Sequence, residues 1–96
     1  MKLKDLQGIS RASLFLAEGY LSEHKDELEK PEVIFRCQRI ISDYLNNNGL
    51  KFDFTNGRDN IIARRTYKVA RKMIKENLEP LEAIEILGKR LRLKLD

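Results

Sequence analysis

The sequence is poor in the residues that build chemical sites and cross-links. It contains one cysteine, Cys37, and one histidine, His24, so it forms no internal disulfide, and these two alone make no multi-ligand zinc site. Tryptophan is absent. No glycine-rich phosphate loop and no nucleophile–base spacing is present. We therefore predict that the protein is not an enzyme and needs no cofactor.

Long apolar runs are also missing. No stretch approaches the roughly 18 apolar residues of a membrane-spanning helix. Residues 1–5 lack the apolar segment of a signal peptide. We therefore expect no membrane association and a reducing, cytoplasmic location.

What the sequence does contain indicates one small helical domain. Its 96 residues are 42% apolar and 35% charged, enough for a single modest core under a highly solvated surface. We predict one domain over residues 1–96, mainly α, in a compact four-helix arrangement.

Apolar residues spaced three and four apart predict the first two helices. The first is expected to begin at an N-cap, Ser10, and to run to about Leu28. The second opens at Pro31 and ends at the glycine-terminated turn 46–49. The short connection between them indicates an antiparallel pair.

The second half of the chain predicts two more helices and leaves a ribbon open. Asp59 is a suitable N-cap for a helix over residues 59–77, and Pro80 opens a fourth helix that Gly88 would end. Residues 50–55 and 90–95 alternate apolar and polar side chains, which is typical of strands. They would pair as a two-stranded antiparallel ribbon, unless the second segment is the frayed end of a helix.

The most basic segment spans residues 58–75, where seven positive charges stand against one negative charge. At about 100° per residue, six of the positive side chains fall within an arc of roughly 120° on the third helix. They are Arg64, Arg65, Lys68, Arg71, Lys72 and Lys75. Neighbouring cations repel each other on such a face. A polyanion would relieve the repulsion; the alternatives are pairing with Glu76 and Glu79, or with acids of another helix.

The basic character belongs to one half of the chain. Residues 1–50 hold seven basic against eight acidic side chains, a balance of −1, and residues 51–96 hold twelve against seven, a balance of +5. This uneven distribution favours a polyanionic partner more specifically than the net charge of +4 does.

The start of the basic helix carries a short motif. Gly57-Arg58-Asp59-Asn60 resembles the glycine-arginine-aspartate-histidine turn before a base-reading helix in bacterial replication-initiator proteins. The resemblance covers four residues, with Asn60 in place of the histidine and without the threonines that follow. It implies that the helix start would reach base edges, and Arg58 and Asn60 suit guanine and adenine respectively. The alternative is a plain turn capped by Asp59.

The third and fourth helices have the proportions of a helix-turn-helix. Its reading helix would be the second of the two, which here carries Glu82 and Glu85 and would repel phosphates. If this unit binds DNA, the basic helix must make the contacts.

Three other residues have simpler interpretations. We expect His24 to be a packed or rim histidine and Cys37 a small buried side chain. Phe15 lies off the apolar stripe of the first helix, where it packs under the N-terminal segment or forms an interface between two copies.

Together these patterns predict a small nucleic-acid-binding regulator or accessory factor. Duplex DNA is favoured over single strands because Tyr67, the aromatic residue of the basic helix, points away from the basic arc. A homodimer would double the contact area. The alternative is a helical inhibitor or adaptor that binds an acidic protein partner.

Overall fold

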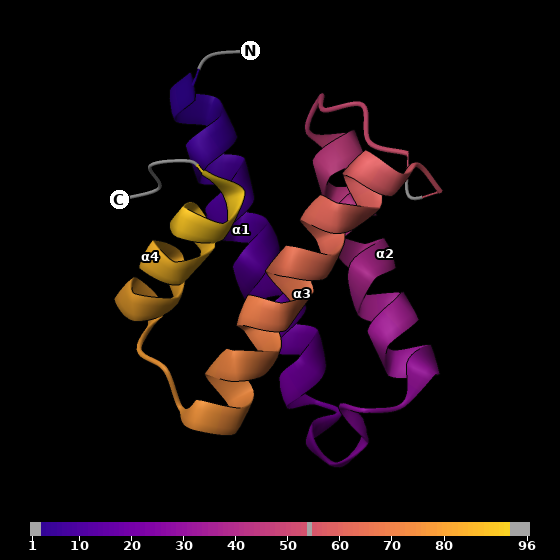
Figure 1. The fold of residues 1–96 in the computed structure, drawn as a ribbon, viewed down its shortest axis with the longest axis vertical. Coiled ribbons are helices and arrows are strands. Elements are labelled where there is room, and N and C mark those ends of the chain that lie inside the picture. The colour runs from indigo at the N-terminus through magenta and orange to yellow at the C-terminus, as the bar shows by residue number, and fades with distance from the viewer. Residues whose placement is uncertain (1–2, 54, 93–96) are drawn as a thin grey trace.

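A computed structural model describes residues 3–53 and 55–92 of the protein. The regular elements of this part of the chain are helices (Figure 1). They are α1 (Leu3–Ser22), the 3₁₀ helix η1 (Lys25–Glu27), α2 (Pro31–Asn47), α3 (Gly57–Glu76) and α4 (Pro80–Leu91). The prediction of a mainly α, four-helix fold is confirmed. A radius of gyration of 12.4 Å is the size expected of one domain of this length.

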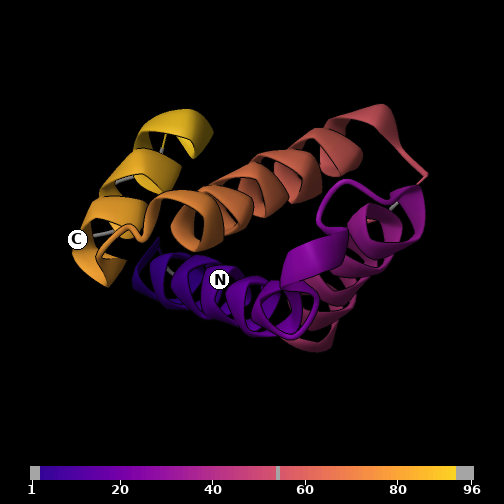
Figure 2. The same ribbon diagram turned by 90° about the horizontal axis from the view of Figure 1, so that it is seen from below.

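Helix α3 is the central element of the arrangement. It packs against α1, α2 and α4, and α1 and α2 pack against each other. Figure 2 shows α4 and α2 on opposite sides of α3, with α1 beneath it. The side of α3 that faces away from α1 is therefore not covered by another helix.

The core forms where the apolar stripes of the four helices meet. Its fully buried members include Leu14 and Leu21 of α1, Ile41 of α2, Val69 of α3 and Leu87 of α4. Small side chains such as Ala17 and Ala70 are buried among them, which lets the helices approach closely. Each stripe predicted from residue spacing thus contributes to one core.

Helix α1 differs from its prediction at both ends. It already begins at Leu3, so Ser10 is a buried residue within the helix rather than its N-cap. The Ser13 hydroxyl donates a hydrogen bond to the Ser10 carbonyl at 2.8 Å, which satisfies this buried side chain within the helix. The helix ends at Ser22, yet Leu28 remains 5% exposed because η1 carries the chain back over the core.

Helix α2 follows its prediction closely. Pro31 stands in its first turn, and Gly49 just beyond its end has a φ of 90°, a conformation that glycine adopts without a steric cost. Val33, Cys37 and Ile41 line its buried side, as their spacing indicated.

The predicted ribbon is wrong over the described residues. Residues 50–53 and 55 form an irregular connection, in which side chains accept the backbone N–H groups of Phe52, Asp53 and Thr55 and the Leu45 carbonyl accepts that of Leu50. Asn46 Oδ1 accepts from the Phe52 N–H at 2.6 Å, and Asp53 Oδ1 accepts from the Thr55 N–H at 2.9 Å. Residue 54 and residues 93–95 lie outside the described part of the chain.

The C-terminal end of α4 also corrects the prediction. Gly88 lies buried within the helix, which runs on to Leu91. Arg92 takes the left-handed conformation that ends it, with a φ of 56°. The segment 90–95, which was predicted to pair with residues 50–55, therefore begins as part of helix α4.

Over residues 3–53 and 55–92, no helix has both the length and the apolar character that crossing a bilayer requires.

Candidate nucleic-acid interface

Asp59 anchors the start of α3 without being its N-cap. The helix begins two residues earlier, at Gly57, so Asp59 lies in the first turn, where a negative charge is favourable. Its Oδ2 atom accepts a hydrogen bond from the Asp53 N–H at 2.7 Å. Asp59 therefore fixes the connection that leads into α3, which corrects the predicted capping role.

The two residues predicted to reach base edges have different positions. Asn60 is partly buried, and its Oδ1 atom is buried in the protein. That oxygen would meet a base edge only after a change of rotamer. The backbone of Arg58 belongs to the first turn of α3, but its side chain lies outside the described structure. Base contacts from this turn stay a prediction.

The division of α3 into a buried and a basic side is confirmed. Ala63, Thr66, Val69 and Ala70 are buried, and so is Tyr67. Thr66 Oγ1 donates to the Ile62 carbonyl at 3.0 Å, which satisfies the hydroxyl within the helix. On the other side Arg64, Arg65 and Lys68 are exposed, and Arg71 and Lys72 are partly exposed.

Tyr67 ties α3 to the connection between α1 and α2. Its hydroxyl donates to the Leu28 carbonyl at 3.1 Å, and burial raises the pKa of this phenol. The Arg71 guanidinium lies over the ring, 5.5 Å from its centroid, a cation–π geometry. The contacts of Tyr67 hold the chain just before Glu29 against α3.

Glu29 neutralises the C-terminal part of the basic face. Its carboxylate accepts a hydrogen bond from Lys75 Nζ and lies 3.6 Å from Arg71 Nη1. These cations, the hydrogen bond from Lys75 first, lower the pKa of Glu29 below its ordinary value. We call Arg71 and Lys75 the paired cluster. The sequence left two sources of acids for these cations, Glu76 and Glu79 or another segment. Among the described residues, Arg71 and Lys75 pair with Glu29, which comes from another segment.

Arg65 links α3 to the end of α4. Its Nη1 donates to the carbonyl of Arg90 at 2.9 Å, so it satisfies one of the carbonyl groups that a helix C-terminus leaves without an intrahelical partner. A guanidinium group has five N–H donors, so this bond leaves most of them available. The bond also restricts where the charge of Arg65 can lie.

A concavity of about 250 Å³ lies beside this link, between α3 and α4. Four cationic side chains and one apolar side chain line it: Ile61, Arg64, Arg65, Lys68 and Arg90. We call its four cations the open cluster. Within the described chain no ion pair involves any of them, and no carboxylate lines the concavity.

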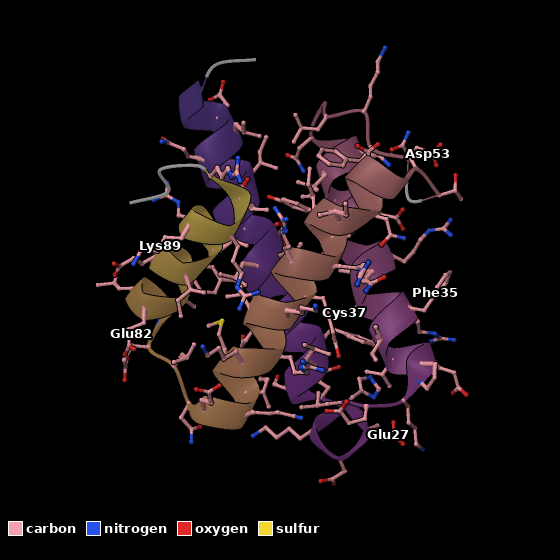
Figure 3. The ribbon with its side chains drawn as sticks, in the orientation of Figure 1. Glu27, Phe35, Cys37, Asp53, Glu82 and Lys89 are labelled. Carbon is pink, nitrogen blue, oxygen red and sulfur yellow. The ribbon has the colours of Figure 1, made fainter. Side chains whose placement is uncertain are left out.

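Arg90 is a residue of the site that the sequence patterns did not indicate. The alternation over residues 90–95 predicted a strand or the frayed end of a helix, and Arg90 lies in the last turn of α4. Consecutive basic residues Lys89 and Arg90 at the end of an amphipathic helix were the available signal. Figure 3 shows both Lys89 and Glu82 at the outer edge of α4. Lys89 Nζ lies 3.5 Å from Glu85 Oε1, as an ion pair within the helix.

The other candidate residues have structural positions. Cys37 lies between helices (Figure 3) with its side chain fully buried, and burial raises the pKa of its thiol to about 12. His24 is partly exposed, with its ring 4.6 Å from that of Tyr20. Phe15 is 36% exposed, which leaves its interface role a prediction. Within residues 3–53 and 55–92, no three acidic, histidine or cysteine side chains are placed to hold a metal ion.

No protein-family model, no curated protein and no solved structure matches the chain. The function must therefore be argued from the site itself.

Proposed function

We propose that the protein binds nucleic acid, with duplex DNA as the favoured form, through the outward face of α3 and the adjoining end of α4. The observation that carries the proposal is the open cluster, in which four cations from two helices line one concavity without a carboxylate. Cations held close together without acidic partners repel one another, and a chain of phosphates would relieve that repulsion.

In this proposal the helices contact the phosphate backbone. Arg64, Arg65 and Lys68 would neutralise backbone phosphate, and Lys72 would extend the contact along α3. Such contacts fix the register of a protein on the duplex and carry no sequence information. Arg58 and Asn60 remain the proposed contacts nearest the bases.

Duplex is proposed rather than single-stranded nucleic acid because single-strand proteins stack bases on exposed aromatic side chains. The aromatic residue of α3, Tyr67, is 3% exposed and holds the core side of the helix. The open cluster offers Ile61, 42% exposed, as its apolar neighbour.

The proposal also includes a small regulatory or accessory role, a cytoplasmic location and a homodimer that doubles the phosphate contacts. A single, deeply buried Cys37 is compatible with a reducing compartment. Sedimentation of the protein with and without DNA tests the dimer directly.

An acidic protein partner is the second candidate, and the paired cluster favours it. Arg71 and Lys75 already bind a carboxylate, that of Glu29, so this face can accept acidic side chains. Salt dependence separates the candidates, because a duplex binder with several phosphate contacts loses orders of magnitude in affinity between about 50 and about 200 mM salt.

The experiment is a binding series on duplex DNA, single-stranded DNA and RNA with two charge-matched double variants. Arg64→Glu with Lys68→Glu reverses two cations of the open cluster, both exposed. Lys25→Glu with Lys51→Glu reverses two exposed cations in the two connections on either side of α2 and changes the net charge equally. We expect the first variant to lower the salt slope by about two units and the second to leave it unchanged. Equal binding by both variants would disprove the proposed site, and failure of the wild type on every nucleic acid at low salt would favour the acidic protein partner.

A further inference from the structure

The open cluster brings together side chains that are far apart in the sequence. Arg64, Arg65 and Lys68 form a contiguous group on α3, because residues three and four apart are neighbours on a helix. Arg90 reaches the same concavity from α4, 25 residues after Arg65. A cation pair on one helix offers a flat surface, whereas two helices offer a hollow with charge on two sides.

The arrangement is partly fixed before any ligand arrives. The bond from Arg65 Nη1 to the Arg90 carbonyl, 2.9 Å long, crosses from α3 to α4 and holds the guanidinium at the concavity. A preorganised group loses less conformational entropy when it binds. The bond also occupies a carbonyl oxygen that would otherwise present negative charge to an incoming anion.

None of the described acids lines the concavity. Glu29 lies with the paired cluster, toward the C-terminal end of α3. Glu85 pairs with Lys89, and Glu82 lies at the outer edge of α4 (Figure 3). Among the described residues, no ion pair neutralises a cation of the open cluster.

The chemistry of the lining indicates the class of ligand. Forked guanidinium groups match the oxygens of phosphate in a bidentate geometry, and a lysine adds a compact positive charge. Ile61 supplies one apolar wall, which suits a phosphate that carries carbon substituents better than a bare ion. A phosphodiester has both features.

We infer that Arg64, Arg65, Lys68 and Arg90 form a binding site for one phosphodiester group of the nucleic-acid backbone. The inference rests on the proposed function for the source of that group. It adds that one phosphate occupies the hollow between the two helices, where Arg90 of α4 and the three cations of α3 share it.

The test is a titration of isotope-labelled protein followed by NMR at the arginine side-chain N–H groups. Inorganic phosphate and a short DNA duplex are added separately, with Arg90→Gln as the variant and Arg36→Gln as its control. Arg36 is an exposed arginine of α2, so the control removes the same charge from another helix. Arg90→Gln keeps the backbone carbonyl that Arg65 binds, so the fold is retained, which thermal unfolding checks.

We expect the duplex to shift the side-chain signals of Arg64, Arg65 and Arg90 together. Arg90→Gln should weaken duplex binding by roughly tenfold at 0.1 M salt and lower the salt slope by about one unit, and Arg36→Gln should change neither. Duplex binding by Arg90→Gln with unchanged affinity and slope would overturn the site while leaving the proposed function intact.

The titration with inorganic phosphate distinguishes failure of the proposed function from failure of the proposed phosphate site. If the wild type binds no duplex, the proposed function fails, and saturable shifts of the same three arginines with inorganic phosphate alone would support an anion site whose source is a free phosphate compound. The absence of shifts with either ligand would overturn the site as well.

Discussion

The two ends of the basic face on α3 carry similar residues and are treated differently by the rest of the fold. At one end the paired cluster, Arg71 and Lys75, is neutralised by Glu29 from the α1–α2 connection. At the other end the open cluster gains a further cation, Arg90, from α4. A charged stripe on a helix is therefore not a site in itself, because neighbouring segments decide which part of it remains available to a partner.

The largest effect is expected from removing the acid that makes the two ends different. Glu29→Gln keeps the shape of the side chain and frees both members of the paired cluster. Two further phosphate contacts would raise duplex affinity on the order of tenfold at 0.1 M salt and steepen the salt slope by up to about two units. Glu32→Gln, an exposed acid in the first turn of α2, is the matched control.

Duplex affinity and its salt slope, measured for both variants, test whether the paired cluster gains phosphate contacts. If Glu29→Gln and Glu32→Gln raise affinity equally, general charge explains the gain, and the paired cluster does not face the nucleic acid.

The difference between the two ends could not be read from the sequence. Periodicity predicted the cations of α3 as one arc and Tyr67 on its opposite side, because both follow from the geometry of a single helix. The pairing of Glu29 with Lys75 joins residues 46 positions apart, and the bond from Arg65 to Arg90 spans 25. Such contacts depend on how helices are placed in space, which spacing within one helix does not encode.

Local signals failed where burial or a nearby side chain decided the local structure instead. Ser10 has the chemistry of an N-cap, but α1 already begins at Leu3, and Ser10 is buried within the helix. Gly88 has the conformational freedom of a helix terminator, but it packs inside α4. Residues 50–53 alternate like a strand, yet the side chains of Asn46 and Asp59 accept the N–H groups of Phe52 and Asp53 in place of a partner strand.

A smaller effect is expected from the anchor that positions Glu29. Tyr67→Phe keeps the ring under Arg71 and removes the hydroxyl that donates to the Leu28 carbonyl. Leaving a buried carbonyl without its donor should lower the free energy of unfolding by about 1–3 kcal/mol. Chemical denaturation measures this loss, and Tyr44→Phe, a partly exposed tyrosine of α2, is its control.

The same variant sharpens the comparison between the clusters. If the bond to Leu28 serves stability alone, duplex affinity stays at the wild-type value. An affinity that rises to that of Glu29→Gln would mean that the hydroxyl is what keeps Glu29 on the paired cluster.

The smallest effect concerns pH, and its sign follows from the lowered pKa of Glu29. The hydrogen bond from Lys75, with the attraction of Lys75 and Arg71, holds this pKa below its ordinary value of 4.5. A group whose pKa is lower in the folded state stabilises the fold above its unfolded pKa, and that contribution is lost as pH falls through the folded pKa. Because Glu29 is exposed, the contribution is modest.

We therefore expect wild type to unfold at a slightly higher temperature than Glu29→Gln at neutral pH, with the gap closing as the solution is acidified below the lowered pKa of Glu29. Thermal unfolding of both proteins across this range measures the gap. Glu27 and Asp53, whose pKa values are also lowered by hydrogen bonds, are present in both proteins, so their titration cancels in the difference. A gap that keeps its size in strong acid would mean that the charge of Glu29 does not contribute to the stability of the fold.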